Sequence, residues 1–365
     1  MESWITRKPT RRIHVGDVPI GNHAPIAVQS MTNTHTDDVT ATVAQIRQLT
    51  AAGCEIVRSA VPDPSAAAAI ATIKSRIDIP LIADVHFDHR LAITAAEAGA
   101  DGLRINPGNI GSMKKVRAVV DCARDHGIPI RIGVNSGSLE KDLVAEYGGV
   151  TPEAMVASAM RHIQLLESLY FHDIKVSLKA SDVYRTVSAY RLLSAQTDVP
   201  LHIGVTEAGG LYPGVVKSAI GIGMLLAEGI GDTLRVSLTR DPVEEVRVGY
   251  EILKALEIRR HGPEIISCPT CGRCNIDLFD IADRVEKALL TRPTPVKVAI
   301  MGCVVNGPGE AKEADIGIAG GDGVGILFRK GVVVKKVPQD RLVEVLLKEV
   351  DDIENSNCRE ESNEK

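Results

Sequence analysis

The sequence predicts an α/β fold, with an N-terminal (β/α)8 TIM-type barrel followed by a small C-terminal α/β domain. Three observations support this. Candidate strands alternate with helical segments eight times, and eight is the number that closes a barrel. The later strands also alternate between apolar and polar residues. Finally, a polar stretch with a Gly-Pro break separates this part from a cysteine-rich segment. The expected boundaries are 1–256 for the barrel, 257–263 for a linker, 264–350 for the second domain and 351–365 for a disordered acidic tail.

The barrel begins after a short strand pair at 12–15 and 18–20, joined by a turn at Gly16-Asp17. The eight barrel strands are expected at 26–32, 55–61, 80–86, 102–106, 129–135, 173–179, 201–207 and 233–239. The clearest helical segments follow at 38–52, 112–126, 151–169 and 242–256.

Residues within each later strand divide between two chemically different faces. The fifth strand sets apolar residues against polar or small ones, with Ile130, Ile132 and Val134 opposing Arg131, Gly133 and Asn135. An open sheet covered by helices on both sides would be apolar on both faces. A closed barrel with a polar, functional upper interior explains the pattern better.

Active sites of such barrels collect at the C-terminal ends of the strands. Those ends supply Arg58, Asp84, His86, Arg104, Asn106, Arg131, Asn135, Lys179, Thr206 and Glu207. Any one of them could be a structural ion pair or a solvated rim residue, but three arginines and a lysine at one mouth favour an anionic, phosphorylated substrate. The loops at 106–111 and 136–138 are suited to meet a phosphate with backbone N–H groups.

The second domain is expected to contain a strand leading into Cys268, a helix at 278–290 and a strand at 296–305 that carries Cys303. Strands at 316–319, 324–328 and 332–336 and a helix at 341–350 complete it. Glycines at 320–325 lie between two strands rather than opening a helix, so they indicate a tight turn and not a dinucleotide loop.

Cysteines dominate the chemistry of the second domain. Cys268, Cys271 and Cys274 are spaced by two residues, and Cys303 and Glu310 follow later. Zinc and iron–sulfur clusters both use Cys-x-x-Cys pairs. A lone return cysteine followed by a carboxylate favours a cluster, since a cubane takes one protein ligand per iron. Structural zinc and free thiols remain the alternatives.

Composition excludes several classes of protein. The net charge is −5, and the tail at 351–365 holds most of it, so no basic surface argues for nucleic acid. Neither a signal peptide nor an apolar run of membrane-spanning length is visible. Seven cysteines do not describe a secreted disulfide framework. We therefore expect a cytoplasmic protein that binds neither nucleic acid nor a membrane.

From about Arg11 to Val350 the sequence resembles the bacterial two-domain 4-hydroxy-3-methylbut-2-enyl diphosphate synthases of the non-mevalonate isoprenoid pathway. The resemblance is carried by five strings: VQSMT at 28–32, RINPGNIG at 104–111, RIGVNSGSL at 131–139, CPTCGR at 268–273 and MGCVVNG at 301–307. It implies one [4Fe-4S] cluster per chain, with Cys268, Cys271, Cys303 and Glu310 as ligands. Cys274 is not among the family's ligands.

The resemblance also implies a diphosphate site made of Arg58, Arg104, Arg131, Asn135 and a lysine of the sixth strand. Lys179 is preferred to Lys175 because it lies nearer the open end, and His86 is a further substrate-binding candidate. Glu310, Arg131, Asn135 and Lys179 are the expected catalytic residues.

The implied reaction is the two-electron reductive opening of 2-C-methyl-D-erythritol 2,4-cyclodiphosphate, with loss of water. Reduced flavodoxin or ferredoxin is the expected electron donor. The linker at 257–263 looks too short to climb past the eighth helix, so a homodimer with catalysis across chains is expected. Two rival interpretations are a pterin- or sugar-phosphate-binding barrel with structural zinc and a non-catalytic interaction module.

Overall fold

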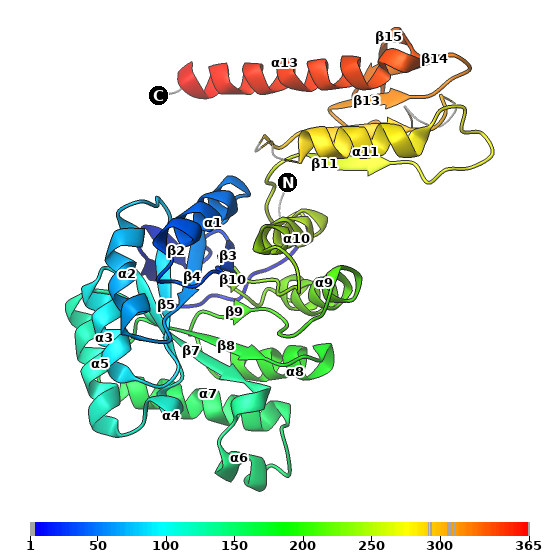
Figure 1. Ribbon diagram of the computed structural model, residues 1–365. Coiled ribbons are helices and arrows are strands. Elements are labelled where there is room, and N and C mark those ends of the chain that lie inside the picture. The colour runs from blue at the N-terminus through cyan, green and yellow to red at the C-terminus, as the bar shows by residue number, and fades with distance from the viewer. Residues whose placement is uncertain (1–3, 291, 293, 305–308, 310, 364–365) are drawn as a thin grey trace. The chain divides into compact units, whose positions relative to one another are not determined.

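The computed structural model describes residues 4–363 except 291, 293, 305–308 and 310, with side chains as far as residue 356 (Figure 1). The chain forms two compact units that divide between Arg259 and Arg260, within the predicted linker.

The first unit is a parallel eight-stranded barrel, as predicted. Its strands lie in the order β8-β7-β6-β5-β4-β3-β10-β9. A parallel bridge from Val176 to Leu201, just before β9, brings the two ends of the sheet together. The strands are β3 (Ala27–Met31), β4 (Ile56–Ala60), β5 (Leu81–Asp84), β6 (Gly102–Ile105), β7 (Ile130–Asn135), β8 (Ile174–Lys179), β9 (His202–Ile203) and β10 (Thr233–Leu234).

Strands β9 and β10 are much shorter than the predicted 201–207 and 233–239. The ladder ends after Ile203, where Gly204 packs directly against the backbone oxygen of Arg235. A Cβ at this position would also lie 2.9 Å from Nζ of Lys179. Glycine is therefore needed for the close approach, which the alternation of residue types does not reveal.

Helices surround the barrel (Figure 1). Several begin at a side chain that accepts a hydrogen bond from the first turn, as Asp63 does from the N–H of Ala66 and Thr151 from that of Ala154. The helices are α1 (Val39–Ala51), α2 (Pro64–Lys74), α3 (His89–Glu97), α4 (Pro107–Ile110), α5 (Met113–Asp125), α6 (Lys141–Glu146), α7 (Pro152–Glu167), α8 (Val183–Ser194), α9 (Leu211–Ala227) and α10 (Pro242–Ala255).

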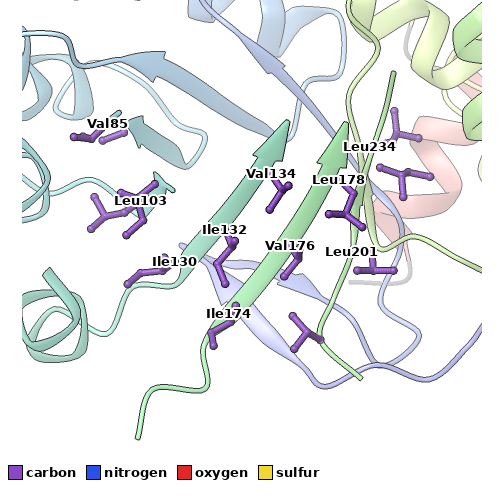
Figure 2. Packing of buried hydrophobic residues seen from close by; sticks show 14 of the residues in the cluster. Val85, Leu103, Ile130, Ile132, Val134, Ile174, Val176, Leu178, Leu201 and Leu234 are labelled. Carbon is purple, nitrogen blue, oxygen red and sulfur yellow. The ribbon is translucent and has the colours of Figure 1, made fainter. Parts of the chain in front are cut away.

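The apolar core lies between the strands and these helices. Figure 2 shows Ile130, Ile132 and Val134 along β7 beside the matching residues of β8. The opposite face of the same strands points into the barrel.

The N-terminal end of the barrel is closed by the antiparallel hairpin of β1 (Ile13–Val15) and β2 (Val18–Ile20). Its apolar residues form one cluster with the starts of three barrel strands, made of Ile13, Val15, Ile20, Ala27, Ile56 and Ile82. This apolar plug leaves the C-terminal ends of the strands as the open mouth.

The second unit contains a mixed five-stranded sheet in the order β11-β12-β13-β14-β15. Strands β11, β12 and β13 pair in parallel, whereas β14 pairs antiparallel with both β13 and β15. Its elements are β11 (Glu264–Ser267), α11 (Leu278–Leu289), β12 (Lys297–Met301), β13 (Ile316–Ala319), β14 (Val324–Arg329), β15 (Val332–Pro338) and α13 (Leu342–Asn363). Both helices bury apolar residues in one cluster with the sheet. The glycines after β13 form a turn between antiparallel strands, as predicted.

The acidic tail differs from its prediction. Helix α13 continues to Asn363 through residues that were expected to be disordered. Ile353 extends the apolar stripe of Leu346 and Val350. Arg292 also binds the tail, since its Nη1 lies 2.6 Å from Asp351 and 2.9 Å from Glu354. Among the described residues, no helix is long and apolar enough to cross a membrane.

Candidate active site

The polar residues predicted at the barrel mouth lie on neighbouring strands in register. Asp84 on β5 faces Arg104 on β6, Arg104 faces Arg131 on β7, and Arg131 faces Lys175 on β8. At the strand ends, Asn135 faces Lys179 in the same way. These positions alternate with the outward-facing apolar residues, so their side chains point into the barrel.

One carboxylate lies among the arginines. Asp84 is 3.4 Å from Nε of Arg58 and 3.1 Å from Nη1 of Arg104, and its side chain is 4% exposed. Burial alone would raise the pKa of this carboxyl, but Arg58, Arg104 and Arg131 together lower the pKa to about 2. Asp84 therefore remains ionised, and it orients two guanidinium groups toward one centre.

His86 lies at the rim of this group. Its Nε2 is 3.0 Å from Nη1 of Arg104 and 3.6 Å from Asp84, and its side chain is half exposed. Burial lowers the pKa of His86, Asp84 opposes the change, and the nearby arginines reinforce it. The imidazole is therefore mainly neutral at pH 7 and available as a hydrogen-bonding group.

Arg131 is almost completely buried inside the barrel. Its Nη1 donates to Oγ of Ser177 at 2.8 Å, while Nε and Nη2 have no hydrogen-bond partner among the described residues. Gly133 makes room for the neighbouring guanidinium, because a Cβ there would lie 2.7 Å from Nη2 of Arg104. Donors that are buried but unpartnered are suited to an anionic ligand.

Lys179 is buried at the end of β8 beside Gly204. Burial lowers its pKa well below the usual value, and Arg131, Arg235 and Arg58 lower it further. Lys175 lies on the same face of β8, nearer the N-terminal end of the strand, and is also buried.

Two residues of the mouth were missed by the sequence-based site prediction. Arg235, just after β10, forms an ion pair with Glu245 of α10 at 3.1 Å. Met31, at the end of β3, places its sulfur 2.9 Å from Nη2 of Arg58 and 3.7 Å from Nη1 of Arg235. The signal for Arg235 was its place on the polar face of the eighth strand. No sequence signal distinguishes Met31 from a core methionine.

A partly buried pair lies beside the loops after β6 and β7. Nε2 of His162 on α7 is 2.9 Å from the carboxylate of Glu140, which also accepts a hydrogen bond from Ser158 at 2.7 Å. A Cβ at Gly108 would lie 3.2 Å from the His162 ring. The pair therefore packs against the first predicted phosphate loop, and Glu140 follows two residues after the second. In the first loop Asn106 accepts from the N–H of Gly108, so that donor is already occupied.

In the second unit, two predicted cluster ligands follow adjacent parallel strands. Ser267 of β11 is in register with Ile300 of β12, so Cys268 and Cys303 leave the same edge of the sheet. Adjacent strands are about 4.8 Å apart. Cys271 is exposed, and Cys268 and Cys303 are partly exposed. Glu310, the fourth predicted ligand, lies outside the described residues.

Cys274 and Cys268 have similar environments. The thiol of Cys274 donates to the backbone oxygen of Ile276 and that of Cys268 to the backbone oxygen of Pro269, each at 3.3 Å, and both side chains pack against the apolar core of the unit. All six cysteines whose side chains are described are free thiols. No group of three potential ligands is assembled for a metal within the described part of the chain. The donor chemistry of Cys268, Cys271 and Cys303 nevertheless fits a soft metal centre.

Comparisons with known proteins cover both units. Residues 10–250 match the family model described as the GcpE TIM-barrel domain, and residues 264–352 match the GcpE protein C-terminal domain. A protein of Lawsonia intracellularis named 4-hydroxy-3-methylbut-2-en-1-yl diphosphate synthase (flavodoxin) is 61% identical over 95% of this chain and 97% of its own. A protein of Geobacter sulfurreducens with the same name is 60% identical over 94% and 98%.

Among solved structures, dihydropteroate synthase from Stenotrophomonas maltophilia matches 68% of this chain and 98% of its own, at 16% identity and a TM-score of 0.49. A similarity this distant says nothing about activity.

Proposed function

This chain belongs to the GcpE family, and from that membership we propose how its residues carry out the reaction for which its relatives are named. The chain is an oxidoreductase of the non-mevalonate isoprenoid route. It converts 2-C-methyl-D-erythritol 2,4-cyclodiphosphate to (E)-4-hydroxy-3-methylbut-2-enyl diphosphate. Counting both compounds as free acids, the ring-opening C–O bond takes two electrons and two protons, and one water is lost.

The observation that carries the assignment of the substrate site is the group of cations in the barrel mouth. Arg58, Arg104 and Arg131 are buried around Asp84, and Lys179 is buried at the adjoining strand end. Buried cations in excess of carboxylates require an anion, and guanidinium groups bind phosphate oxygens in pairs. A cyclic diphosphate supplies that charge.

Each of these side chains has a distinct role. Arg104 and Arg58, oriented by Asp84, bind and orient the diphosphate. Arg131 has two donor atoms for a phosphate oxygen, since neither has a partner among the described residues. Lys179 and Asn135, side by side at the strand ends, complete the clamp, and His86 contacts the substrate from the rim. Because the donors are fixed before binding, they also stabilise the negative charge that develops as the ring opens.

Cys268, Cys271 and Cys303 would hold a [4Fe-4S] cluster, with Glu310 as the fourth ligand. When bound, the cluster supplies electrons one at a time and a Lewis-acidic iron at the breaking C–O bond. A carboxylate is a harder ligand than a thiolate, so Glu310 would be the ligand that a soft metal centre holds least tightly. Free, partly exposed thiols support this ligand set and fit a reducing cytoplasm.

The electron donor is a small carrier protein. The relatives from Lawsonia intracellularis and Geobacter sulfurreducens are named as flavodoxin enzymes. We infer that reduced flavodoxin, or a ferredoxin in its place, delivers the two electrons singly.

The active form is a homodimer in which the cysteine domain of one chain caps the barrel of the other. Arg259 supports this, because its Nη1 donates to the backbone oxygen of Ile26 at 2.7 Å and lies 2.8 Å from Glu55. Both partners precede barrel strands, so the chain is bound at the plugged end. Residues 260–263 then span at most about 14 Å, while α10 alone is about 21 Å long. So short a linker favours a cysteine domain that serves the barrel of a partner chain.

An exposed apolar stripe on α9 supports self-association. Tyr212, Val216, Ile220 and Met224 recur at every fourth residue of this helix, and they are 83%, 56%, 47% and 40% exposed. A stripe of this kind on a monomer indicates a protein interface.

Anaerobic purification tests the proposal. The protein should be brown, with broad visible absorption, and should convert the cyclic diphosphate when reduced flavodoxin is supplied. A colourless protein with one bound zinc, or an iron-loaded protein without turnover, would contradict it.

A further inference from the structure

Lys175 lies deeper in the barrel than the residues that reach the mouth. It points inward from β8, four positions before Lys179, which along a strand is about 13 Å. The residue is 1% exposed, and its Nζ has no hydrogen-bond partner among the described residues. The nearby His202 does not satisfy it, since Nε2 of that imidazole is also without a hydrogen-bond partner in the described part of the chain.

The charges that face Lys175 are mostly positive. Arg131 approaches from β7 and Arg58 from β4, while Lys179 lies on its own strand. His202 on β9 is also near, but burial and the surrounding cations lower the pKa of its imidazole well below the usual value, so it adds no charge at pH 7. Asp232, just before β10, is the nearby carboxylate.

That carboxylate is already engaged by other groups. Asp232 accepts hydrogen bonds from Arg7 at 3.2 Å, from Thr10 at 2.9 Å and from the N–H of Leu201 at 2.9 Å. Lys175 therefore has no counter-charge of its own in this part of the barrel.

An ammonium group in such a place is unstable without an anion. Burial lowers the pKa of Lys175 well below its usual value, Arg131 and Arg58 lower it further, and Asp232 opposes them only weakly. The arginines keep their protons, because guanidinium groups are not deprotonated in proteins. In the free protein the lysine, rather than an arginine, is thus the group whose charged form is disfavoured.

We propose that Lys175 takes up a proton from solvent when a diphosphate binds in the barrel mouth, and that it acts as a counter-charge beneath the ligand without touching it. The inference rests on the proposed function, which places the diphosphate among Arg58, Arg104, Arg131 and Lys179. The step is a protonation only: the amine of Lys175 becomes an ammonium, and no other bond changes. Lys179, at the barrel mouth, also takes up part of a proton when the diphosphate binds.

The cyclic diphosphate is a clean probe for this process. Each of its phosphorus atoms bears a single, strongly acidic oxygen, so the ligand stays a dianion throughout the neutral range. Any proton taken up on binding therefore belongs to the protein. The linkage also fixes the pH dependence, because binding that takes up one proton weakens about tenfold for each pH unit above the pKa of the free group.

The experiment is calorimetry on the anaerobic holoprotein without reductant, so that the ligand binds but does not react. Titrations in buffers of different ionisation enthalpy give the number of protons taken up, and titrations from pH 7 to 9.5 give the slope of log Kd. We expect wild-type protein to take up protons, and Lys175→Met to take up fewer by up to one proton with a flatter slope. Lys217→Met, on the outer surface of α9, should match the wild type.

Lys175→Arg separates the charge from the proton, since arginine stays charged. It should lose the same proton uptake as Lys175→Met and yet bind more tightly at pH 9.5 than the wild type. Binding with undiminished proton uptake in both Lys175 variants would overturn the inference and leave the proposed function intact. Absence of any binding by the wild type would overturn the proposed function itself.

Discussion

Asp84 accepts a hydrogen bond from Nη1 of Arg104 at 3.1 Å, and both side chains are almost completely buried. The second oxygen of the same carboxylate lies 3.4 Å from Nε of Arg58. One acid thus orients two of the cations that are available to a diphosphate. The two guanidinium groups keep Asp84 ionised, and the carboxylate in turn holds them in place. Asp84 therefore contributes both to the stability of the barrel and to the position of the substrate-binding arginines.

Removing the charge of Asp84 should destabilise the barrel. In Asp84→Asn, two buried guanidinium groups lose their carboxylate, and breaking a buried pair in this way costs about 3–5 kcal/mol. Urea unfolding followed by circular dichroism measures the loss. Asp121→Asn is the matched control, because its ion pair with Arg124 is about half exposed and such pairs are worth about 1 kcal/mol or less. Equal stability of the two variants would contradict the role of Asp84.

The same carboxylate predicts a pH dependence. Its pKa is lowered to about 2 in the folded protein, against about 3.9 in an unfolded chain. The stability that Asp84 contributes is therefore complete above pH 4 and is lost as the pH falls from about 4 to about 2. The loss should be about 2–3 kcal/mol. Unfolding free energies between pH 5 and 2 should fall less steeply in Asp84→Asn, and parallel curves for the two proteins would disprove the assignment.

The barrel itself was predictable because local patterns encode it. Ile130, Ile132 and Val134 identified the outward face of β7, and Arg131 was thereby placed inside. The arginines at the strand ends followed from the same alternation. These features depend on neighbours two residues apart, which a single sequence displays directly.

Contacts between distant segments were not predictable. The sulfur of Met31 contacts Arg58 on β4 and Arg235 just after β10. Glu140, just before α6, pairs with His162 on α7. The tail was misjudged for a similar reason. Its charges suggested disorder, but Arg292, some sixty residues earlier, pairs with Asp351 and Glu354 and holds the helix.

Loss of a mouth arginine should weaken substrate binding and spare the cluster. Arg104→Ala and Arg131→Ala each remove a charged hydrogen-bond donor, which is worth about 1.5–3 kcal/mol. Calorimetry with the cyclic diphosphate measures the change, while the visible spectrum reports the cluster. Arg47→Ala, on the exposed side of α1, is the control. Unchanged affinity in both mouth variants would mean that the diphosphate binds elsewhere.

The cysteine variants should separate ligands from bystanders. Cys268→Ser, Cys271→Ser and Cys303→Ser should each lose most of the iron, because a hydroxyl is a poor ligand for it. Cys274→Ser should retain iron and activity, because three other cysteines and Glu310 already supply the four proposed ligands, one for each iron. Iron content and visible absorption after anaerobic purification give the result. If Cys274→Ser purifies without iron, the assignment of Glu310 as fourth ligand falls.

Complementation between two inactive chains tests catalysis across the dimer. Arg131→Ala damages the barrel site and leaves the cysteines intact, whereas Cys268→Ser does the reverse. In a mixed dimer with catalysis across chains, one of the two sites joins an intact barrel to intact cysteines, so activity should return to as much as half of the wild-type value per dimer. Within a single chain, by contrast, every site would carry one lesion.

The heterodimer should be isolated with two different affinity tags and assayed anaerobically beside each homodimer. The structural reason to expect recovery is Arg259, which binds Ile26 and Glu55 at the plugged end of the barrel and leaves only residues 260–263 before β11. Chains that exchange freely but remain inactive as verified heterodimers would show that each barrel uses its own cysteines. The anchoring by Arg259 would then have to be broken in the active enzyme, and Arg259→Ala should accelerate turnover.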